Sequence, residues 1–209
     1  MALKLWHCAG SRSIRPLWTL EEMGLDYELE VMQFPPRFLH PGYAEINPIG
    51  TVPYFVDDKD GPDNIIQMTE SAGISQYLVD LYGPSTLAVE PSEVGYGGYL
   101  NWIHRSDATL TFPQTLVLRY TLLEPEATRS PKVAEDYTKW FYSRLRSVDL
   151  ATADNEFLVA NRFTIADITV GYALYLADTL GLAEGFKSNT KAYYERLKQR
   201  PAFQKAISL

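Results

Sequence analysis

The stretch Asn47-Pro48-Ile49-Gly50-Thr51-Val52-Pro53 decides the fold of this chain, because it leads from a helical turn into a strand that opens with a proline. Proline cannot donate a hydrogen bond to a sheet, so it belongs at a sheet edge or at the first residue of a strand. A cis Val52–Pro53 bond would turn the backbone N–H and C=O of Val52 outward, toward a peptide-like ligand. Because only about 5–6% of X–Pro bonds in folded proteins are cis, a trans proline opening an edge strand is the alternative interpretation.

A second motif, Thr69-Glu70-Ser71, opens a helix directly after a predicted strand. The start of a helix offers unpaired N–H groups and the positive end of the helix dipole, which suit a carboxylate. The Ser71 hydroxyl can add a hydrogen bond, and Glu70 can receive an ammonium group. Together they fit one end of an α-amino acid, whereas simple capping of the helix by Thr69 or Ser71 is the alternative.

Outward from these motifs, the first 83 residues alternate between strand and helix patterns. Pro16 lacks the N–H that a helix needs beyond its first turn, so the first helix is predicted to begin near Ser13 and to end at Gly24, a residue suited to a left-handed stop. A second helix is predicted from Glu70–Ser71 to Gly83. The predicted strands cover residues 2–7, 25–32, 52–56 and 65–68.

Beyond residue 83 the strand-like alternation disappears. Residues 84–92 are rich in proline and read as a linker, and residues 93–209 are predicted to be an all-helical domain. Pro113 is expected to kink or split the first long helix. The predicted helices cover residues 94–123, 131–150, 165–180 and 190–199, with a short one after residue 201.

Composition excludes several classes of function. The 209 residues include 19 Lys and Arg against 26 Asp and Glu, a net charge of −7 that disfavours binding to nucleic acid or to an anionic membrane. The longest apolar stretch, Ile168 to Ala177, is too short to span a bilayer, and the N-terminus does not read as a signal peptide. Cys8 is the only cysteine, which suits a reducing, cytoplasmic location. His7, His40 and His104 share no metal-ligand spacing, so no metal site is expected.

The chain resembles the cytosolic glutathione transferase family over nearly its whole length. The resemblance is carried by NPIGTVP at 47–53, TES at 69–71, RPLWTLEEMGLDYE at 15–28 and the segment Phe163–Ile168. It implies an α/β thioredoxin-like domain at residues 1–83, an all-α second domain, a cis bond before Pro53, and a homodimer. It also implies glutathione as co-substrate, with the Val52 backbone pairing its cysteinyl unit while Glu70 and Ser71 hold its γ-glutamyl ammonium and carboxylate.

The segment Phe163–Ile168 is expected to have a structural role. Thr164 and Asp167 form a capping box, and Phe163 packs toward Ile168.

His40 follows the prolines at 35 and 36 and is a candidate contact for the glycine carboxylate of glutathione. An exposed loop histidine is the alternative.

The group that activates the thiol is harder to assign. An unperturbed thiol has a pKa near 8.5, and lowering it by about two units requires about 2.7 kcal/mol of selective thiolate stabilisation. In the family the donor is Ser, Tyr or Cys in the loop before the first helix, but Gly10 and Arg12 occupy the usual positions here. Ser11 is the first candidate and Arg12 the second, while Ser13 is expected to cap the helix. A solvated loop serine is the alternative for Ser11.

Cys8 suggests a competing chemistry. Cys8-x-x-Ser11 has the spacing of a monothiol redox site, and a cysteine of low pKa near a helix start forms mixed disulfides with glutathione. The late helix start inferred from Pro16 favours instead a buried cysteine at the end of a strand.

The second substrate is expected to be a small hydrophobic electrophile bound by the helical domain. His104, Asp107, Ala108 and Thr111 share one face at helical spacing, with a solvated ion pair as the alternative. The predicted function is conjugation of the glutathione thiolate to such an electrophile. The alternatives are a glutathione-dependent disulfide or peroxide reductase, and a non-catalytic glutathione-binding or interaction protein of the same fold.

Overall fold

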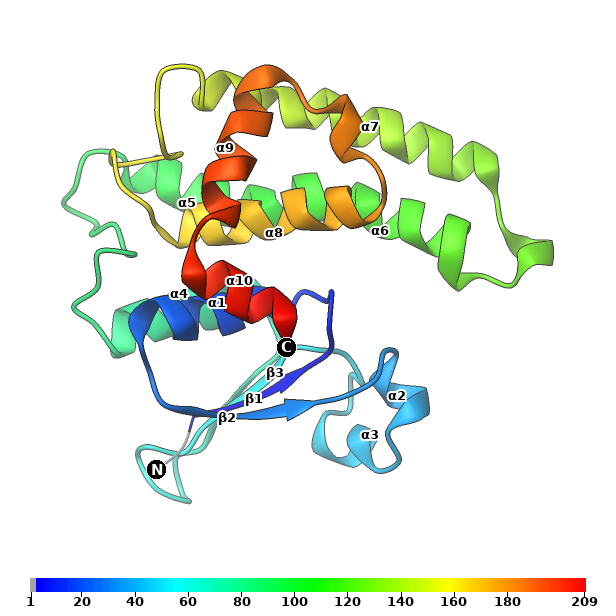
Figure 1. The fold of residues 1–209 in the computed structure, drawn as a ribbon. Helices are drawn as coiled ribbons and strands as arrows, with labels where there is room; N and C mark the ends of the chain where they lie inside the picture. Colours follow the sequence, from blue (N-terminus) through cyan, green and yellow to red (C-terminus); the bar gives the residue numbers. More distant parts are fainter. Residues whose placement is uncertain (1–2) are drawn as a thin grey trace. The chain divides into compact units, whose positions relative to one another are not determined.

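A computed structural model describes residues 3–209, which divide into two compact units (Figure 1). The first unit runs up to Ala88 and includes the C-terminal segment Gln199–Leu209, and the second is Val89–Lys198. The sequence analysis had placed that C-terminal segment with the helical domain. It packs with the first unit because the ring of Phe203 lies against Trp18, with ring centroids 4.7 Å apart.

The first unit is built on a four-stranded sheet in the order β2-β1-β3-β4. Its strands are β1 (Leu3–His7), β2 (Tyr27–Val31), β3 (Tyr54–Asp57) and β4 (Ile66–Met68). β1 is parallel to β2, whereas β3 is antiparallel to both β1 and β4. The four predicted strands are therefore confirmed, including the β3–β4 hairpin.

The register of the sheet brings distant segments to one of its ends. Trp6 lies opposite Tyr54, and Phe55 lies opposite Met68. Because β3 runs antiparallel to its two neighbours, the chain leaves β1, enters β3 and leaves β4 at the same end. The loop after His7, the segment before β3 and the start of the helix after β4 therefore share this end of the sheet.

The helices of the first unit include α1 (Ile14–Met23), α4 (Ser71–Leu81) and α10 (Pro201–Ser208), and α1 packs against both of the others (Figure 1). Pro16 lies in the first turn of α1, as predicted. Gly24 ends the helix at φ 63°, a left-handed conformation that glycine adopts without a steric cost.

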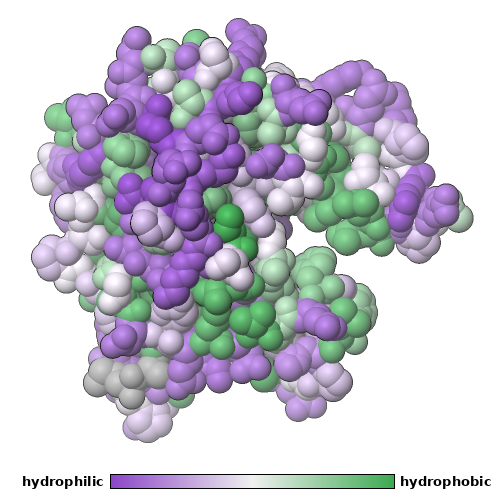
Figure 2. Space-filling view, in the orientation of Figure 1, coloured by the Kyte–Doolittle hydropathy of each residue, from purple (hydrophilic) through white to green (hydrophobic). Residues whose placement is uncertain are grey.

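Two short helices, α2 (Pro36–Leu39) and α3 (Tyr43–Ile46), occupy the connection from β2 to β3, part of which was predicted as irregular loop. Several large hydrophobic side chains of this connection are exposed, and Figure 2 shows hydrophobic residues on its surface at the lower right. They are Phe34, Phe38, Leu39, Ile46 and Ile49.

The first long helix of the second unit alternates between α-helical and π-helical winding. It consists of α5 (Tyr96–Arg105), the π-helical η1 (Ser106–Thr111), α6 (Phe112–Leu118) and the π-helical η2 (Arg119–Leu123). Pro113 lies at the start of α6, directly after η1. Because proline lacks an N–H and crowds the carbonyl four residues before it, a wider π turn accommodates it within a continuous helix.

The second unit continues through η3 (Glu126–Thr128), α7 (Pro131–Ala151), α8 (Ile165–Thr179), η4 (Ala183–Gly185) and α9 (Ser188–Lys198). α8 is the central helix, since almost all its residues are buried and it packs against α5, η1 and α9. Within residues 3–209, no helix has both the length and the apolar character that crossing a membrane requires.

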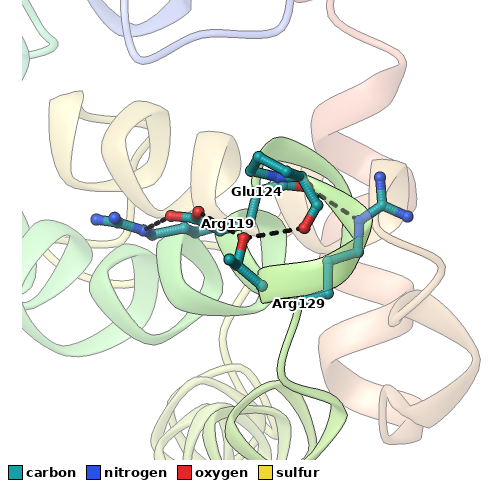
Figure 3. Close-up of polar contacts among 5 residues, drawn as sticks. Arg119, Glu124 and Arg129 are labelled. Atoms are coloured by element: carbon teal, nitrogen blue, oxygen red, sulfur yellow. Dashed lines mark hydrogen bonds and ion pairs between the residues drawn. The ribbon is translucent and has the colours of Figure 1, made fainter.

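The turn between η2 and α7 is closed by polar contacts to Glu124 (Figure 3). The carboxylate accepts hydrogen bonds from Arg119 Nε at 2.6 Å and from Thr128 Oγ1 at 3.3 Å. Arg129 Nε donates to the backbone carbonyl of Glu124 at 3.1 Å. These contacts satisfy carbonyl and carboxylate oxygens where the helix ends.

The predicted capping box at the start of α8 is confirmed. The Thr164 hydroxyl accepts from the Ala166 N–H at 3.2 Å, and the Asp167 carboxylate accepts from the Thr164 N–H at 2.9 Å. Asp167 is completely buried and also accepts from the Leu158 N–H and the Tyr193 hydroxyl. It therefore ties α9 and the preceding loop to α8, which is the structural role predicted.

Candidate functional site

The Val52–Pro53 peptide bond is cis, as predicted. The Val52 side chain points into a core cluster that includes Trp6, Cys8 and Tyr43. The Val52 backbone forms no hydrogen bond with any residue in the described range 3–209. Its N–H and C=O are thus available for pairing with a peptide-like ligand, while the inward side chain fixes their position.

Asn47 holds the loop that leads to Pro53. Its side-chain nitrogen donates to the Thr51 carbonyl at 2.8 Å, and its side-chain oxygen accepts from the Ile49 N–H at 3.2 Å. Tyr43 Oη donates to the same Thr51 carbonyl at 2.7 Å. Gly50 has a φ of +67°, and a Cβ there would lie 3.0 Å from the Cβ of Arg37, so this position requires glycine.

Ser71, the first residue of α4, is buried and held by a buried arginine. Arg15 Nη1 donates to Ser71 Oγ at 2.9 Å, and both residues are at most 1% exposed. Since the Ser71 oxygen accepts from Arg15, its own proton can be donated to an anion. A guanidinium group and a helix N-terminus together favour negative charge at this point.

Glu70 is the residue before α4 and is exposed. Its carboxylate accepts no hydrogen bond from the part of the chain that the structure describes, so it can receive an ammonium group. Glu70 is the N-cap residue of α4 and its side chain makes no capping hydrogen bond. The Ser71 hydroxyl, one of the two predicted capping groups, accepts from Arg15 instead.

The buried hydroxyl groups of Thr19 and Ser75 hold Arg15 and Ser71 in place. Thr19 Oγ1 lies 2.9 Å from the Arg15 carbonyl oxygen and 2.9 Å from Ser75 Oγ. Ser75 Oγ donates to the Ser71 carbonyl at 3.2 Å. These bonds fasten α1 to the first turn of α4 and fix the position of Ser71.

The loop before α1 contains a chain of three hydrogen-bonding side chains. Ser11 Oγ lies 2.6 Å from Ser13 Oγ, which lies 2.7 Å from His7 Nδ1. Ser13 also accepts from the Cys8 N–H at 3.3 Å. The prediction that Ser13 caps α1 is wrong, because its hydroxyl turns toward His7 and makes no capping bond.

Burial changes the acid–base properties of two side chains in this loop. His7 is 0% exposed, and burial lowers its pKa from 6.5 to about 4. Burial raises the pKa of the Cys8 thiol to about 11. The imidazole is therefore neutral at pH 7, and Cys8 stays a thiol in the core, in agreement with the prediction of a buried cysteine.

The remaining predicted residues of the first unit lie at or beside this loop and the β2–β3 connection. Gly10 has a φ of +73°, and a Cβ there would meet no atom within 4 Å. Arg12 and Ser11 are half-buried. His40 is also half-buried, and its ring stacks on Tyr43 with centroids 6.5 Å apart.

The four residues predicted to bind the second substrate are not equivalent in the structure. His104 and Ala108 are exposed and Asp107 is half-buried, but Thr111 is buried and donates to the Ser106 carbonyl at 2.7 Å. Thr111 therefore does not share an exposed face with the other three residues, because η1 is π-helical and does not keep α-helical spacing.

A cavity of about 400 Å³ in the second unit is not formed by those four residues. Its lining comes from α5 and η1 on one side and from α7 on the other: Arg105, Thr109, Ser143, Arg144, Arg146, Ser147 and Leu150. Among residues 3–209, no cluster of three or more His, Cys, Asp and Glu side chains could hold a metal ion.

Sequence reasoning missed three supporting residues. His7 was considered only as a metal ligand, and Arg15 only as part of a helix, although a buried partner for each lies in the structure. Asn47 was part of the quoted motif, but no role was assigned to it. The one available signal was the arginine directly before Pro16, a charged residue in the first turn of a helix whose neighbours are apolar.

Comparison with known proteins identifies the first unit. Residues 1–80 match the family model described as "Glutathione S-transferase, N-terminal domain". Residues 1–80 thus carry the N-terminal domain of the glutathione transferase family. The thioredoxin-like first unit followed by a helical second unit is the fold of solved glutathione transferases, as the resemblance implied.

Similarity to individual glutathione transferases extends over the whole chain. "Glutathione S-transferase 3" of Schizosaccharomyces pombe is 27% identical over 95% of this chain and 84% of its own length. The crystal structure of a glutathione transferase from Methylococcus capsulatus is 27% identical, covers 99% of this chain and 98% of its own, and has a TM-score of 0.82. A homologue from Lodderomyces elongisporus, solved with two glutathione molecules per subunit, is 20% identical, covers 100% and 98%, and has a TM-score of 0.86.

Proposed function

We propose that this protein binds glutathione at the shared end of its sheet and adds the glutathione thiolate to a small hydrophobic electrophile. One observation carries the proposal: the strand register gathers the Val52 backbone, the start of α4 and the Ser11 loop at that end. Each of these segments offers one of the groups that a γ-glutamyl tripeptide thiol requires. The family model matched by residues 1–80 and the glutathione-bound homologue support the binding of glutathione.

Each part of glutathione has a counterpart among these residues. The Val52 N–H and C=O pair with the backbone of the cysteinyl unit, beside the cis Pro53. Ser71 and the free N–H groups at the start of α4 bind the γ-glutamyl carboxylate, with the Arg15 guanidinium behind them. Glu70 binds the γ-glutamyl ammonium, and His40 contacts the glycine carboxylate.

Ser11 is the group we assign to the sulfur. A hydroxyl that donates to a thiolate stabilises the charged form and lowers the thiol pKa. Lowering that pKa by about two units requires about 2.7 kcal/mol, within the range measured for a single hydrogen-bond donor in an active site. Arg12 is the second candidate, through its cation or its backbone N–H.

The electrophile is assigned to the second unit. His104, Asp107 and Ala108 offer a partly exposed surface of mixed polarity, whereas the buried Thr111 serves the packing of η1. Residues 1–83 would hold glutathione, residues 84–92 would link the parts, and residues 93–198 would supply the hydrophobic substrate site.

The competing functions differ in their support. A Cys8-dependent disulfide or peroxide reductase is disfavoured because the thiol is buried and its pKa is raised to about 11. A non-catalytic glutathione-binding protein is favoured by Gly10 and Arg12 at the positions where the family carries its activating residue. We also propose a homodimer in the cytoplasm that takes part in detoxification and binds no nucleic acid, in keeping with the family and with the net charge of −7.

Retention on a glutathione-affinity resin tests the binding site. The wild-type protein is expected to be retained, and its melting temperature is expected to rise with added glutathione. Glu70→Ala and Ser71→Ala should each weaken binding at least about tenfold, the effect of losing about 1.4 kcal/mol of polar contact. Activity is then measured with a panel of electrophiles.

A control variant separates binding from folding. Asp63→Ala removes an exposed carboxylate from the β3–β4 turn, at the opposite end of the sheet. This variant should bind glutathione like the wild type. A wild-type protein that ignores the resin and shows no melting shift contradicts the proposal, and binding without activity on any electrophile supports the non-catalytic alternative.

A further inference from the structure

The hydrogen bonds that join Ser11, Ser13 and His7 can run in either of two directions. The direction determines whether the Ser11 hydroxyl can donate its proton to a ligand. Each serine hydroxyl has one proton to donate and two lone pairs that accept. If Ser13 donates to His7 Nδ1, Ser11 donates inward to Ser13 and its proton is used. If His7 Nδ1–H donates to Ser13, Ser13 donates to Ser11, and the proton of Ser11 remains for a ligand.

The surroundings of His7 favour the second direction. His7 Nε2 is buried and has no hydrogen-bond partner among residues 3–209. A neutral imidazole carries its proton on one nitrogen only, so a proton on Nε2 would leave a buried N–H unpaired, which is rarer in proteins than an unpaired acceptor. The proton therefore belongs on Nδ1, where Ser13 Oγ accepts it at 2.7 Å.

The other contacts of the two serines are consistent with this direction. Ser13 Oγ then accepts from His7 and from the Cys8 N–H at 3.3 Å, and it donates to Ser11 Oγ at 2.6 Å. The alternative acceptor for its proton, the Cys8 carbonyl, is farther away at 3.5 Å. Ser11 Oγ accepts from both the hydroxyl and the N–H of Ser13, the latter at 3.3 Å. Both lone pairs of Ser11 are then engaged, and only its proton is left to donate.

We propose that His7 and Ser13 are positioning residues that direct the Ser11 hydroxyl proton toward the sulfur of bound glutathione. This inference rests on the proposed function, since it assigns Ser11 to the thiol. His7 orients the two serine hydroxyls because its ring proton lies on Nδ1, and it does not gain or lose a proton in this role. Its pKa of about 4 keeps the direction of the chain unchanged over the pH range in which the thiol ionises.

The test measures the pKa of the thiol of bound glutathione from the ultraviolet absorbance of the thiolate as pH is varied. His7→Leu and Ser13→Ala should each raise this pKa by about one unit, which lowers kcat/KM about tenfold at pH values well below the wild-type pKa. Ser11→Ala should raise it at least as much. His7→Asn places an amide nitrogen where Nδ1 lies, so it should restore most of the wild-type value.

Affinity for S-methylglutathione, which has no thiol to ionise, provides the control. It should change less than about twofold in the His7 and Ser13 variants, because those residues do not hold the tripeptide. If the wild type binds no S-methylglutathione, the proposed function and this inference both fail. If the wild type binds it and ionises glutathione, but His7→Leu and Ser13→Ala titrate the thiol like the wild type, the inference alone is overturned.

Discussion

At the scale of single residues, the groups that we assign to glutathione are held by buried residues. Ser71 is fixed by the fully buried Arg15, and Ser11 is fixed through Ser13 by the fully buried His7. Burying a polar group costs free energy unless it forms a hydrogen bond. The arrangement in which Arg15 bonds Ser71 and His7 bonds Ser13 is therefore strongly favoured. Ser71 and Ser11, which we assign to the ligand, are held in position by these buried partners.

His7 also makes the stability of the first unit depend on pH. Its pKa is 6.5 in an unfolded chain and about 4 when folded, so the unfolded chain binds more protons between these values. Stability present above pH 6.5 is therefore lost as pH falls toward 4, by on the order of 3 kcal/mol. The free energy of unfolding of the wild type and of His7→Asn is measured in urea at several pH values. Between pH 6.5 and pH 4, the wild type should lose that much more stability than His7→Asn. Parallel curves would show that His7 is not responsible.

At the scale of elements, the start of α8 organises the second unit. Asp167 accepts hydrogen bonds from the Leu158 and Thr164 N–H groups and from the Tyr193 hydroxyl. These bonds favour the carboxylate, but burial outweighs them and raises its pKa to about 6. The linkage has the opposite sign to that of His7: the folded chain binds more protons between about pH 4 and 6, so stability falls as pH rises through this range.

Removing the Asp167 side chain should therefore destabilise the second unit strongly. Asp167→Ala leaves three buried donors without an acceptor, which is expected to cost about 3 kcal/mol in free energy of unfolding. Thr164→Ala removes only the helix cap and should cost about 1 kcal/mol. Asp136→Ala, which removes an exposed carboxylate from α7, serves as control and should cost less than about 0.5 kcal/mol. Equal stability of Asp167→Ala and Asp136→Ala in urea would refute this role.

At the scale of the whole molecule, the chain returns to its first unit at the C-terminus. Phe203 of α10 covers Trp18, and Arg200 forms two hydrogen bonds to Glu22, at 2.6 and 2.7 Å. Lys205 adds an ion pair with Glu21 at 2.8 Å. α1 carries the Ser11 loop at its start and Arg15 in its first turn, so α10 supports the helix that holds part of the candidate site.

Phe203→Ala should reveal this support. Removal of a fully buried aromatic ring is expected to lower the free energy of unfolding by about 3–5 kcal/mol. Lys205→Ala removes a mostly exposed ion pair and should cost less than about 1 kcal/mol. The comparison is made by urea unfolding together with glutathione affinity. If Phe203→Ala is as stable as Lys205→Ala, the packing of α10 against α1 does not stabilise the first unit.

The sequence predicted the order of elements in the first unit because prolines and glycines mark their limits, as Pro16 and Gly24 do for α1. The NPIGTVP motif at residues 47–53 predicted the cis bond before Pro53. The sequence could not predict the contact between Arg15 and Ser71, since the two lie 56 positions apart and pair only when α1 meets α4. The π-helical turn at residues 106–111 also escaped prediction, because α-helical periodicity was assumed through Pro113.

The most direct test of this account is a crystal structure of the protein with glutathione bound. We expect the sulfur within hydrogen-bond distance of Ser11 Oγ, the cysteinyl backbone paired with Val52, and the γ-glutamyl carboxylate on Ser71. A sulfur bound by Arg12 or lying next to Cys8, or a tripeptide held away from this end of the sheet, would contradict the central claim.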